Sequence, residues 1–383
     1  MKWEKVRLED CCYSISDGDH QPPPKAQQGI PFVTISNINS MNQLDFSDTM
    51  FVPKEYYQSL DEKRKVRKGD VLYSVVGSFG IPVLIKEERP FVFQRHIAIL
   101  RPKEDIVDSG FLFYTMLSRD FYAKADAVAI GAAQRTVSLG SLRNIKIDVP
   151  SLESQKHIAD ILSAYDDLIE NNQKQIKLLE EAAQRLYKEW FVDLRFPGHE
   201  NTKIVDGVPE GWIKEEIGKI IKKVHRTKQI VASEYKDEGS IPIVDQSRAF
   251  VAGYTNDLEA RVDFGIPIIV FGDHTRIVKL IQFPFAKGAD GTQLIISGCL
   301  EMPQRLLYCS IMNVDLSNYH YARHFKYLKE EKIMIPTVKV ANEFENNVTG
   351  IFSKIQNCRD EIIRCQKTRD LLLPKLMSGE VEV

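Results

Sequence analysis

Two long stretches of the sequence follow one pattern. Residues 142–186 read LRNIKIDVPSLESQKHIADILSAYDDLIENNQKQIKLLEEAAQRL, and residues 328–372 read LKEEKIMIPTVKVANEFENNVTGIFSKIQNCRDEIIRCQKTRDLL. Each stretch begins as a short strand pattern that ends in a proline, Pro150 or Pro336, and continues as a long helical pattern. The prolines and the final leucines are both 186 residues apart. Self-similarity at a fixed offset predicts two copies of one structural unit.

The helical part of each copy has heptad spacing, which buries an apolar seam against a partner helix by knobs-into-holes packing. Asn172 and Arg369 interrupt this seam, and we interpret them as polar residues that fix its register. The alternative is two unrelated amphipathic helices on separate globular cores. Equal length, phase and offset favour two helices that pair with each other. The predicted seam consists of Ile158, Leu162, Tyr165, Ile169, Ile176, Leu179, Leu186, Phe344, Val348, Ile351, Ile355, Ile362 and Leu372.

The region before each helix is patterned as short strands rich in β-branched and aromatic residues and bounded by Gly and Pro. The two regions correspond loosely, because Pro31 to Gly77 spans 46 residues and Pro242 to Gly272 spans 30. The excess in the first half includes the basic run 63–68. The expected strands include 32–35, 71–76, 96–100, 241–244, 268–271 and 294–296.

These patterns predict an α+β fold with two mixed α/β domains joined by two long helices. The residues between the halves, 196–200, are rich in helix breakers and predict a linker. The expected bounds are 1–150 for the first domain, 151–195 for the first helix, 196–336 for the second domain and 337–383 for the second helix.

Composition and charge fit an ordinary globular protein. The chain has 383 residues, a net charge of −2, 43% hydrophobic residues and 27% charged residues, which excludes a disordered or collagen-like chain. No apolar run approaches the ~20 residues that cross a bilayer, and the start lacks the apolar core of a signal peptide. We therefore expect a cytoplasmic protein that does not contact membranes. The six cysteines lack zinc-site spacing, which favours reduced structural thiols.

The chain contains no motif that predicts catalysis. Glycine-rich dinucleotide and phosphate loops are absent, and the eight histidines lack metal-ligand spacing. His157 is interpreted as a solvated or structural residue near a helix start. The acid-x-Lys triplets at 61–63 and 330–332 lie in charge runs and are interpreted as solvated faces. We expect a non-catalytic chain that binds neither a metal nor a cofactor.

The expected loops at the strand ends combine hydrogen-bonding side chains with cations. Arg reads guanine, Asn and Gln read adenine, and Ser, Thr and Lys bind phosphates, so these loops are candidates for DNA contact. The alternative is that they are ordinary solvated loops. The candidates are His20, Gln21, Lys25, Ser36, Asn37, Lys65, Lys68, Ser78, Gln94, Arg95, His96, Gln134, Arg135, Gln246, Ser247, Arg248, His274, Arg276, Gln293, Tyr321, Arg323 and His324.

Several motifs in order make the chain recognisable along nearly its whole length. They are GAAQRTV at 131–137, LRNIKIDVP at 142–150, ESQKHIA at 153–159, EWFVD at 189–193 and LLPKLMSGE at 372–380. In this order they resemble the DNA-specificity subunits of type I restriction–modification systems. The second half departs from the Gly-Ala-x-Gln pattern, because it has YARHF at 321–325, which weakens the assignment of that loop.

The resemblance implies two target-recognition domains that each read half of a split DNA sequence, and an antiparallel coiled coil that sets their spacing. It implies partners: double-stranded DNA and two modification subunits, with a restriction subunit as an optional further member. The modification subunits would bind S-adenosylmethionine and methylate adenine, and no cofactor would bind to this chain.

Helix length is compatible with such a spacer. About 39 residues at 1.5 Å per residue give a helix of about 58 Å, whereas adjacent major-groove faces lie ~34 Å apart. Antiparallel pairing of a tandem repeat also creates a pseudo-two-fold axis, and different loops would make the DNA site asymmetric. Two rival functions stay open at this point: a coiled-coil scaffold that binds proteins, and an enzyme with an unrecognised site.

Overall fold

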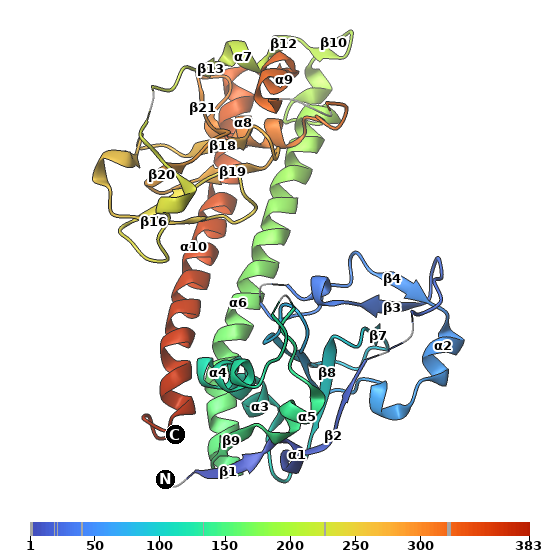
Figure 1. Ribbon diagram of the computed structural model, residues 1–383. Coiled ribbons are helices and arrows are strands. Elements are labelled where there is room, and N and C mark those ends of the chain that lie inside the picture. The colour runs from blue at the N-terminus through green and yellow to red at the C-terminus, as the bar shows by residue number, and fades with distance from the viewer. Residues whose placement is uncertain are drawn as a thin grey trace. The chain divides into compact units, whose positions relative to one another are not determined.

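The computed structural model describes residues 3–18, 20, 22–39, 41–132, 134–225, 227–319 and 323–383. The chain forms two compact units: unit 1 comprises Met1–Asn171 and Ile362–Val383, and unit 2 comprises Asn172–Glu361 (Figure 1). Both limits fall inside the long helices, so each unit contains half of each helix. They therefore differ from the helix–domain limits expected from sequence, because each helix half belongs to the core of a globular region.

Unit 1 contains three antiparallel or mixed sheets (Figure 1). In the four-stranded sheet the order is β2-β8-β5-β6, and in the three-stranded sheet it is β4-β3-β7, with β3 and β7 parallel. A third, two-stranded sheet pairs β1 with β9. The strands are β1 (Glu4–Arg7), β2 (Cys12–Asp17), β3 (Ile30–Val33), β4 (Met50–Val52), β5 (Val71–Ser74), β6 (Pro82–Leu84), β7 (Val92–Phe93), β8 (Ile97–Pro102) and β9 (Lys146–Val149).

Unit 2 repeats this topology. Its four-stranded sheet has the order β13-β21-β18-β19, its second sheet contains β16-β15-β20 with β15 and β20 parallel, and β12 pairs with β22. The internal repeat expected from sequence is thus confirmed for these sheets, whereas β10, β11, β14 and β17 have no counterpart among the described strands of unit 1. The strands are β10 (Ile204–Val205), β11 (Val208–Pro209), β12 (Ile213–Glu216), β13 (Ile221–Lys222), β14 (Gln229–Ile230), β15 (Ile241–Val244), β16 (Gly253–Thr255), β17 (Arg261–Val262), β18 (Ile268–Gly272), β19 (Val278–Ile281), β20 (Phe285–Gly288), β21 (Thr292–Ser297) and β22 (Lys332–Ile335).

Short helices connect the strands, and N-cap side chains begin several of them. Asp108, Ser118 and Ser138 each accept a hydrogen bond from a backbone N–H in the first turn of the following helix. Two short helices, α2 and η2, account for much of the excess length of the first half, since they lie between β4 and β5. The short helices are α1 (Leu8–Cys11), η1 (Ile35–Asn37), α2 (Lys54–Ser59), η2 (Glu62–Arg64), α3 (Ser109–Leu117), α4 (Arg119–Ala127), α5 (Leu139–Asn144), η3 (Lys188–Val192), η4 (His199–Asn201), α7 (Ile217–Ile220), η5 (Ala232–Glu234), η6 (Leu258–Ala260), α8 (Gln304–Met312) and α9 (His324–Glu330).

The two long helices, α6 (Leu152–Tyr187) and α10 (Val338–Met377), pack against each other inside each unit. In unit 1 the start of α6 shares a core with the end of α10, and Arg369 donates to Asp166 at 2.6 Å. In unit 2 the buried Asn172 donates to Glu361 at 2.8 Å, while Tyr187 contacts Phe344. The pairing is therefore antiparallel, and both polar interruptions of the seam have partners on the other helix.

All of the predicted seam residues are buried or half-buried. They face more than the partner helix, because the core around Ile158 and Leu162 also contains strand residues and Phe111 of α3. Each helix half therefore also completes a globular core, and the heptad assignment itself stays a prediction. Buried are Ile158, Leu162, Ile169, Phe344, Val348 and Ile355, and half-buried are Tyr165, Ile176, Leu179, Leu186, Ile351, Ile362 and Leu372.

The segment after α6 is anchored rather than extended. A π-helical turn, η3, ends the helix, and Leu194 adopts a left-handed φ of 57°. Phe196 is only 2% exposed and packs on Trp212 with ring centroids 4.5 Å apart. The predicted linker thus contributes to the core of unit 2. Among the helices of the described ranges, none is long and apolar enough to cross a membrane.

Candidate nucleic-acid interface

Several loops of unit 1 meet at one end of the four-stranded sheet. Beyond β5, the Val75 amide donates to the His96 carbonyl at 2.8 Å and the Gly77 amide donates to the Arg135 carbonyl at 3.0 Å. The β2 end approaches closely too, because a Cβ on Gly18 would lie 2.3 Å from the Phe93 carbonyl oxygen. Only glycine fits there. We call the polar residues of these loops surface 1, which consists of Ser78, Gln94, Arg95, His96 and Gln134.

The corresponding loops of unit 2 meet in the same way. The Asp273 amide donates to the Gly291 carbonyl at 2.7 Å, and the His324 amide donates to the Asp273 carbonyl at 2.9 Å. The loop after β15 joins them, because the Thr275 hydroxyl donates to the Gln246 carbonyl at 2.7 Å. We call the accessible polar residues of these loops and of the start of β21 surface 2, which consists of Arg248, His274, Gln293 and Arg323.

Half of the candidates present polar groups that the protein itself does not use. Their side chains make no hydrogen bond or ion pair with the part of the chain that the structure describes. Arg95 is among them, since no carboxylate of the described residues pairs with its guanidinium. These candidates are Lys25, Lys68, Ser78, Gln94, Arg95, His96, Gln134, Arg248, His274, Gln293 and Arg323.

Nine other candidates form internal contacts that shape the loops. Asn37 accepts from both the amide and the hydroxyl of Thr34. The amide group of Gln246 donates to the Asp290 carbonyl and accepts from the His274 amide, at 2.8 and 3.1 Å. Sequence reasoning could not separate such residues from the accessible ones. The nine are His20, Ser36, Asn37, Lys65, Arg135, Gln246, Ser247, Arg276 and His324.

Some candidates are not brought together with surface 1. Lys65 and Lys68 precede β5, whereas Ser78 follows it, so these lysines lie at the opposite end of that strand. Lys25 precedes Ala26, which pairs with Phe51 at the edge of the other sheet. Two further candidates, Gln21 and Tyr321, lie outside the described residues.

Arg276 and His324 form a partly buried polar contact beside surface 2, between an exposed guanidinium and a buried imidazole. His324 is 4% exposed, and its Nε2 accepts from Arg276 Nε at 3.3 Å. Burial, followed by the neighbouring Arg276 charge, lowers the pKa of His324. This favours the neutral ring, which can accept that hydrogen bond. Arg276 adopts a left-handed φ of 59° and also donates to the Tyr319 carbonyl, so the contact fixes the loop after β18.

The sequence analysis missed one charged residue of this region, Lys279. Its ammonium is buried on β19 and donates to the backbone carbonyls of Asp245 and Ala249, on the loop after β15. The only available signal was a lysine within the apolar strand pattern VKLI. Its target loop precedes it by about 30 residues, so no local motif connects the two.

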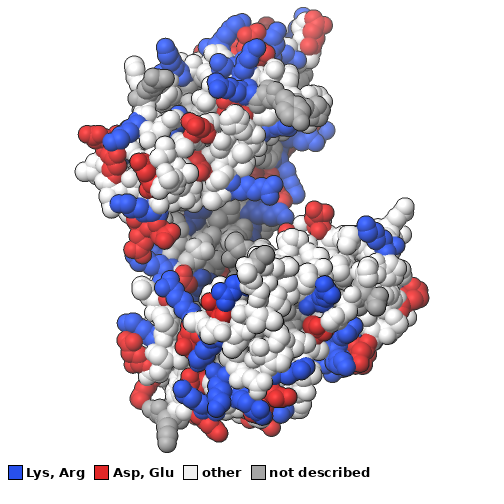
Figure 2. Space-filling model, viewed as in Figure 1, with Lys and Arg blue, Asp and Glu red and all other residues white. Residues whose placement is uncertain are grey.

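Positively and negatively charged side chains are interspersed on the surface. On the face drawn in Figure 2, Lys and Arg alternate with Asp and Glu over both units, in agreement with the net charge of −2. Among the described residues, no group of three or more His, Cys, Asp and Glu side chains is placed to bind a metal ion.

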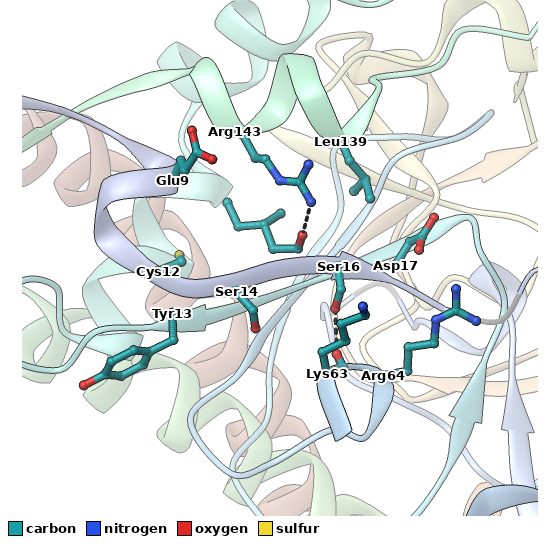
Figure 3. A pocket seen from close by; sticks show the side chains of 11 residues that line it. Glu9, Cys12, Tyr13, Ser14, Ser16, Asp17, Lys63, Arg64, Leu139 and Arg143 are labelled. Atoms are coloured by element: carbon teal, nitrogen blue, oxygen red, sulfur yellow. Dashed lines mark hydrogen bonds between the residues drawn. The ribbon is translucent and has the colours of Figure 1, made fainter. Parts of the chain in front are cut away.

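A pocket of about 490 Å³ lies beside the edge strand β2 (Figure 3). Arg143 donates to the Ile15 carbonyl at 2.6 Å, which covers part of the strand edge, and the Ser16 hydroxyl donates to the Lys63 carbonyl. Acids and bases both line it, including Glu9 and Lys63. This mixed lining does not resemble a phosphate site.

The fold and its two loop surfaces define a duplicated, helix-linked protein with side chains suited to DNA. Comparison with known proteins gives the same class. Residues 1–181 match the family described as "Type I restriction modification DNA specificity domain". The chain is 28% identical over 344 residues to the MjaIX specificity subunit of Methanocaldococcus jannaschii, which covers 82% of this chain and 78% of that protein.

Two further relatives agree. The HindI specificity subunit of Haemophilus influenzae is 30% identical over 199 residues, covering 50% of this chain and 41% of that one. The crystal structure of a type I restriction–modification S subunit from M. genitalium has the same fold, with a TM-score of 0.60, 15% identity and coverage of 98% and 96% of the two chains. The chain belongs to the specificity subunits of type I restriction–modification systems.

The chain is thus the DNA specificity subunit of such a system. The subunit is not itself catalytic, and methylation and restriction are activities of the assembled complex. The family resemblance expected from sequence is confirmed.

Proposed function

We propose that each unit reads one half of a split, asymmetric DNA sequence. In this proposal residues 1–150 and 196–336 are the two target-recognition domains, and the long helices in 151–195 and 337–383 are the spacer. Surface 1 contacts one half-site and surface 2 contacts the other. Lys25 and Lys68, which lie apart from surface 1, contact phosphates outside the bases that surface 1 reads.

The observation that carries this proposal is the placement of accessible polar side chains at matching strand ends. The duplicated topology puts the loop after β5 and the loop after β18 in equivalent positions, and each lies beside a turn that leads into β8 or β21. Both loop sets carry side chains with unused hydrogen-bonding groups, such as Arg95 and Arg248. Polar side chains without a partner in the protein can bond with a ligand that supplies hydrogen-bond donors and acceptors. The edges of DNA bases supply such groups.

The chemistry of the two surfaces differs, which supports an asymmetric target. The turn before β8 contains Gln94, Arg95 and His96, whereas the turn before β21 contains Ala289 and Asp290. Arg pairs bidentately with guanine and Gln with adenine, so different residues at equivalent positions read different bases. A homodimer would instead present identical surfaces and read a palindrome.

The partners follow from the family. A type I system works as a complex, and we propose that two modification subunits assemble with this chain and carry the S-adenosylmethionine, with a restriction subunit as an optional member. The 36 residues of α6 extend over about 54 Å, which is longer than one turn of B-DNA. The helix pair would therefore set the distance between the half-sites.

A domain exchange in the complex with the modification subunits tests the proposal. Replacing residues 1–150 with those of a relative should change one half of the methylated sequence, and leave the other half and the spacer length unchanged. Sequencing of methylated host DNA reads all three quantities. A change in both halves, or in the spacer, would contradict the assignment of one half-site to each domain.

A salt titration separates this proposal from a protein-binding scaffold. The complex should bind target duplex with an affinity that falls steeply with salt, because Lys and Arg contacts release counterions. The control is the same complex on a duplex with both half-sites scrambled. Equal affinity for the two duplexes at every salt concentration would contradict sequence-specific recognition.

A further inference from the structure

Lys279 is a buried cation in the middle of a strand. Its side chain is 4% exposed, and Nζ donates to the Asp245 carbonyl at 2.8 Å and to the Ala249 carbonyl at 2.5 Å. The Asp245 carboxylate lies 4.0 Å away. The ammonium thus contacts both ends of the five-residue segment 245–249 and closes it into a loop.

Burial of an ammonium is unfavourable unless hydrogen bonds and a counter-charge compensate for lost water. Two carbonyls and one carboxylate do so here, and burial still lowers the pKa of Lys279 to about 8. An apolar residue at this position of β19 would avoid the free energy that is lost when an ammonium is buried. A departure from the apolar pattern is expected where function requires it.

Unit 1 has an apolar residue, Val83, at the position equivalent to Lys279. On the β5–β6 ladder Val83 pairs with Leu72, and on the β18–β19 ladder Lys279 pairs with Val270. Leu72 and Val270 occupy equivalent positions, because they pair with Ile99 and Leu294 on the matching central strands. Val83 packs in an apolar core, so the fold itself does not need a lysine there.

The loop that Lys279 closes belongs to the proposed DNA surface of unit 2. It contains Arg248, whose guanidinium has no partner among the described residues, and Gln246, which connects it to the two neighbouring loops. The loop after β3 in unit 1 is stabilised differently, by the local contacts between Thr34 and Asn37. The loop after β15 has its own local contacts, because the Asp245 carboxylate accepts from the amide and the hydroxyl of Ser247, at 2.9 and 2.6 Å. The contact that connects the two ends of this loop, however, comes from Lys279 on another sheet.

We propose that Lys279 is a positioning residue for half-site recognition by unit 2: it fixes the loop 245–249 so that Arg248 meets the DNA in one geometry. The inference rests on the proposed function. Lys279 itself does not contact DNA in this proposal, because it is buried beneath the loop.

The test uses the complex of full-length chain and modification subunits and measures methylation of duplexes with single mismatches in either half-site. Lys279→Met removes the donor at similar length. It should reduce discrimination in the second half-site by about tenfold, the equivalent of losing a hydrogen bond to a charged group, and leave the first half-site unchanged. Lys279→Arg keeps the charge and donors and should restore part of the discrimination.

Lys287→Met is the matched control, because Lys287 is a half-buried lysine on β20 of the same unit whose ammonium makes no hydrogen bond or ion pair with the described residues, although its backbone pairs with Val244 beside the loop. It should leave both half-sites unchanged. Hydrogen exchange gives a second readout that does not need DNA. In Lys279→Met the amides of residues 246–248 should exchange faster, while those of β18 keep their protection.

Three results would overturn the proposal. They are unchanged discrimination at the second half-site in Lys279→Met, equal loss at both half-sites, and equal effects of the Lys279 and Lys287 variants. Failure of the proposed function looks different, since wild-type complex would then not discriminate second half-site mismatches at all, whereas the exchange of residues 246–248 would still report loop closure.

Discussion

Units 1 and 2 share a strand order but stabilise their loops by different means. In unit 1 Arg101 on β8 donates to Asp70 and to the Lys65 carbonyl, which fixes the longer segment before β5. In unit 2 the equivalent strand is apolar at that point, and the buried cation is Lys279 on β19, which fixes the loop after β15. The sheets are thus common to both units, while the charged contacts that shape the loops are particular to each.

This difference shows which parts of the fold tolerate changes of side chain. The helix cores and most ladder positions carry apolar side chains in both units, and Arg101 and Lys279 are charged exceptions. A loop needs only some contact that fixes it, which local capping, a buried ion pair or a distant lysine can each supply. Loops of different chemistry can therefore be carried on one frame.

The largest expected effect compares the two cores. Phe344 of unit 2 and Phe111 of unit 1 are both fully buried. Phe344→Ala should lower the free energy of unfolding of unit 2 by about 3–5 kcal/mol, because it leaves a cavity among Tyr187, Trp190 and Phe191. Hydrogen exchange should show protection lost in β18 before β5, and Phe111→Ala should reverse that order. Equal loss in both strands would contradict separate cores.

The second prediction compares the pH dependence of the stability of unit 2 with and without Lys279. The pKa of Lys279 is lowered to about 8 from its ordinary 10.5, so between these values the unfolded chain binds a proton that the folded chain does not. Stability of unit 2 should therefore rise with pH in this window, relative to Lys279→Met, by roughly 3 kcal/mol over the whole window. Below pH 8 the difference between the two proteins should be constant. Denaturant melts at several pH values measure it, and a fall across the window would contradict the buried, depressed ammonium.

Base contacts should produce an intermediate effect. Arg95→Ala should reduce the discrimination between correct and incorrect bases at one position of the first half-site by about 1–3 kcal/mol. Arg248→Ala should do the same at one position of the second half-site. Methylation rates on single-mismatch duplexes measure both. If Arg95→Ala instead reduced discrimination in the second half-site, surface 1 would have to be assigned to that half-site and surface 2 to the first.

The smallest effect concerns phosphate contacts. Lys68 is exposed and unpaired among the described residues, whereas the ammonium of Lys65 donates to Glu62 at 2.7 Å. Lys68→Ala should weaken binding to all sequences alike and reduce the slope of log affinity against log salt by about 0.9. Lys65→Ala is the control and should leave the slope unchanged. The same slope in both variants would remove Lys68 from the DNA-contacting set.

Much of the fold was predictable because it depends on local pattern. The strand at 241–244 coincides with β15, and the long helices begin just after Pro150 and Pro336 as expected. Heptad spacing predicted buried faces on both helices. It did not predict that Ile158 and Phe344 would complete sheet cores, because a heptad pattern does not specify what lies on the other side of the seam.

The candidate site was predictable as a set of loops but not residue by residue. Polar and cationic residues after strands are visible in the sequence, and Arg95 and Arg248 lie at the expected strand ends. Gln246 and Asn37 look equally suited to read adenine, yet their amide groups contact Asp290 and Thr34. A polar side chain is available to DNA only when the folded chain leaves it without a partner.

The sequence by itself determined the duplication, the positions of the strands and long helices and the membership of the family, because these depend on periodicity, on glycine and proline, and on motifs in order. Tertiary structure alone decided that each unit contains half of each helix, which polar groups stay unused, and that Lys279 reaches back about 30 residues to close a loop. The physical reason is that burial and hydrogen-bond pairing join residues distant in the chain, and no local pattern encodes such a contact.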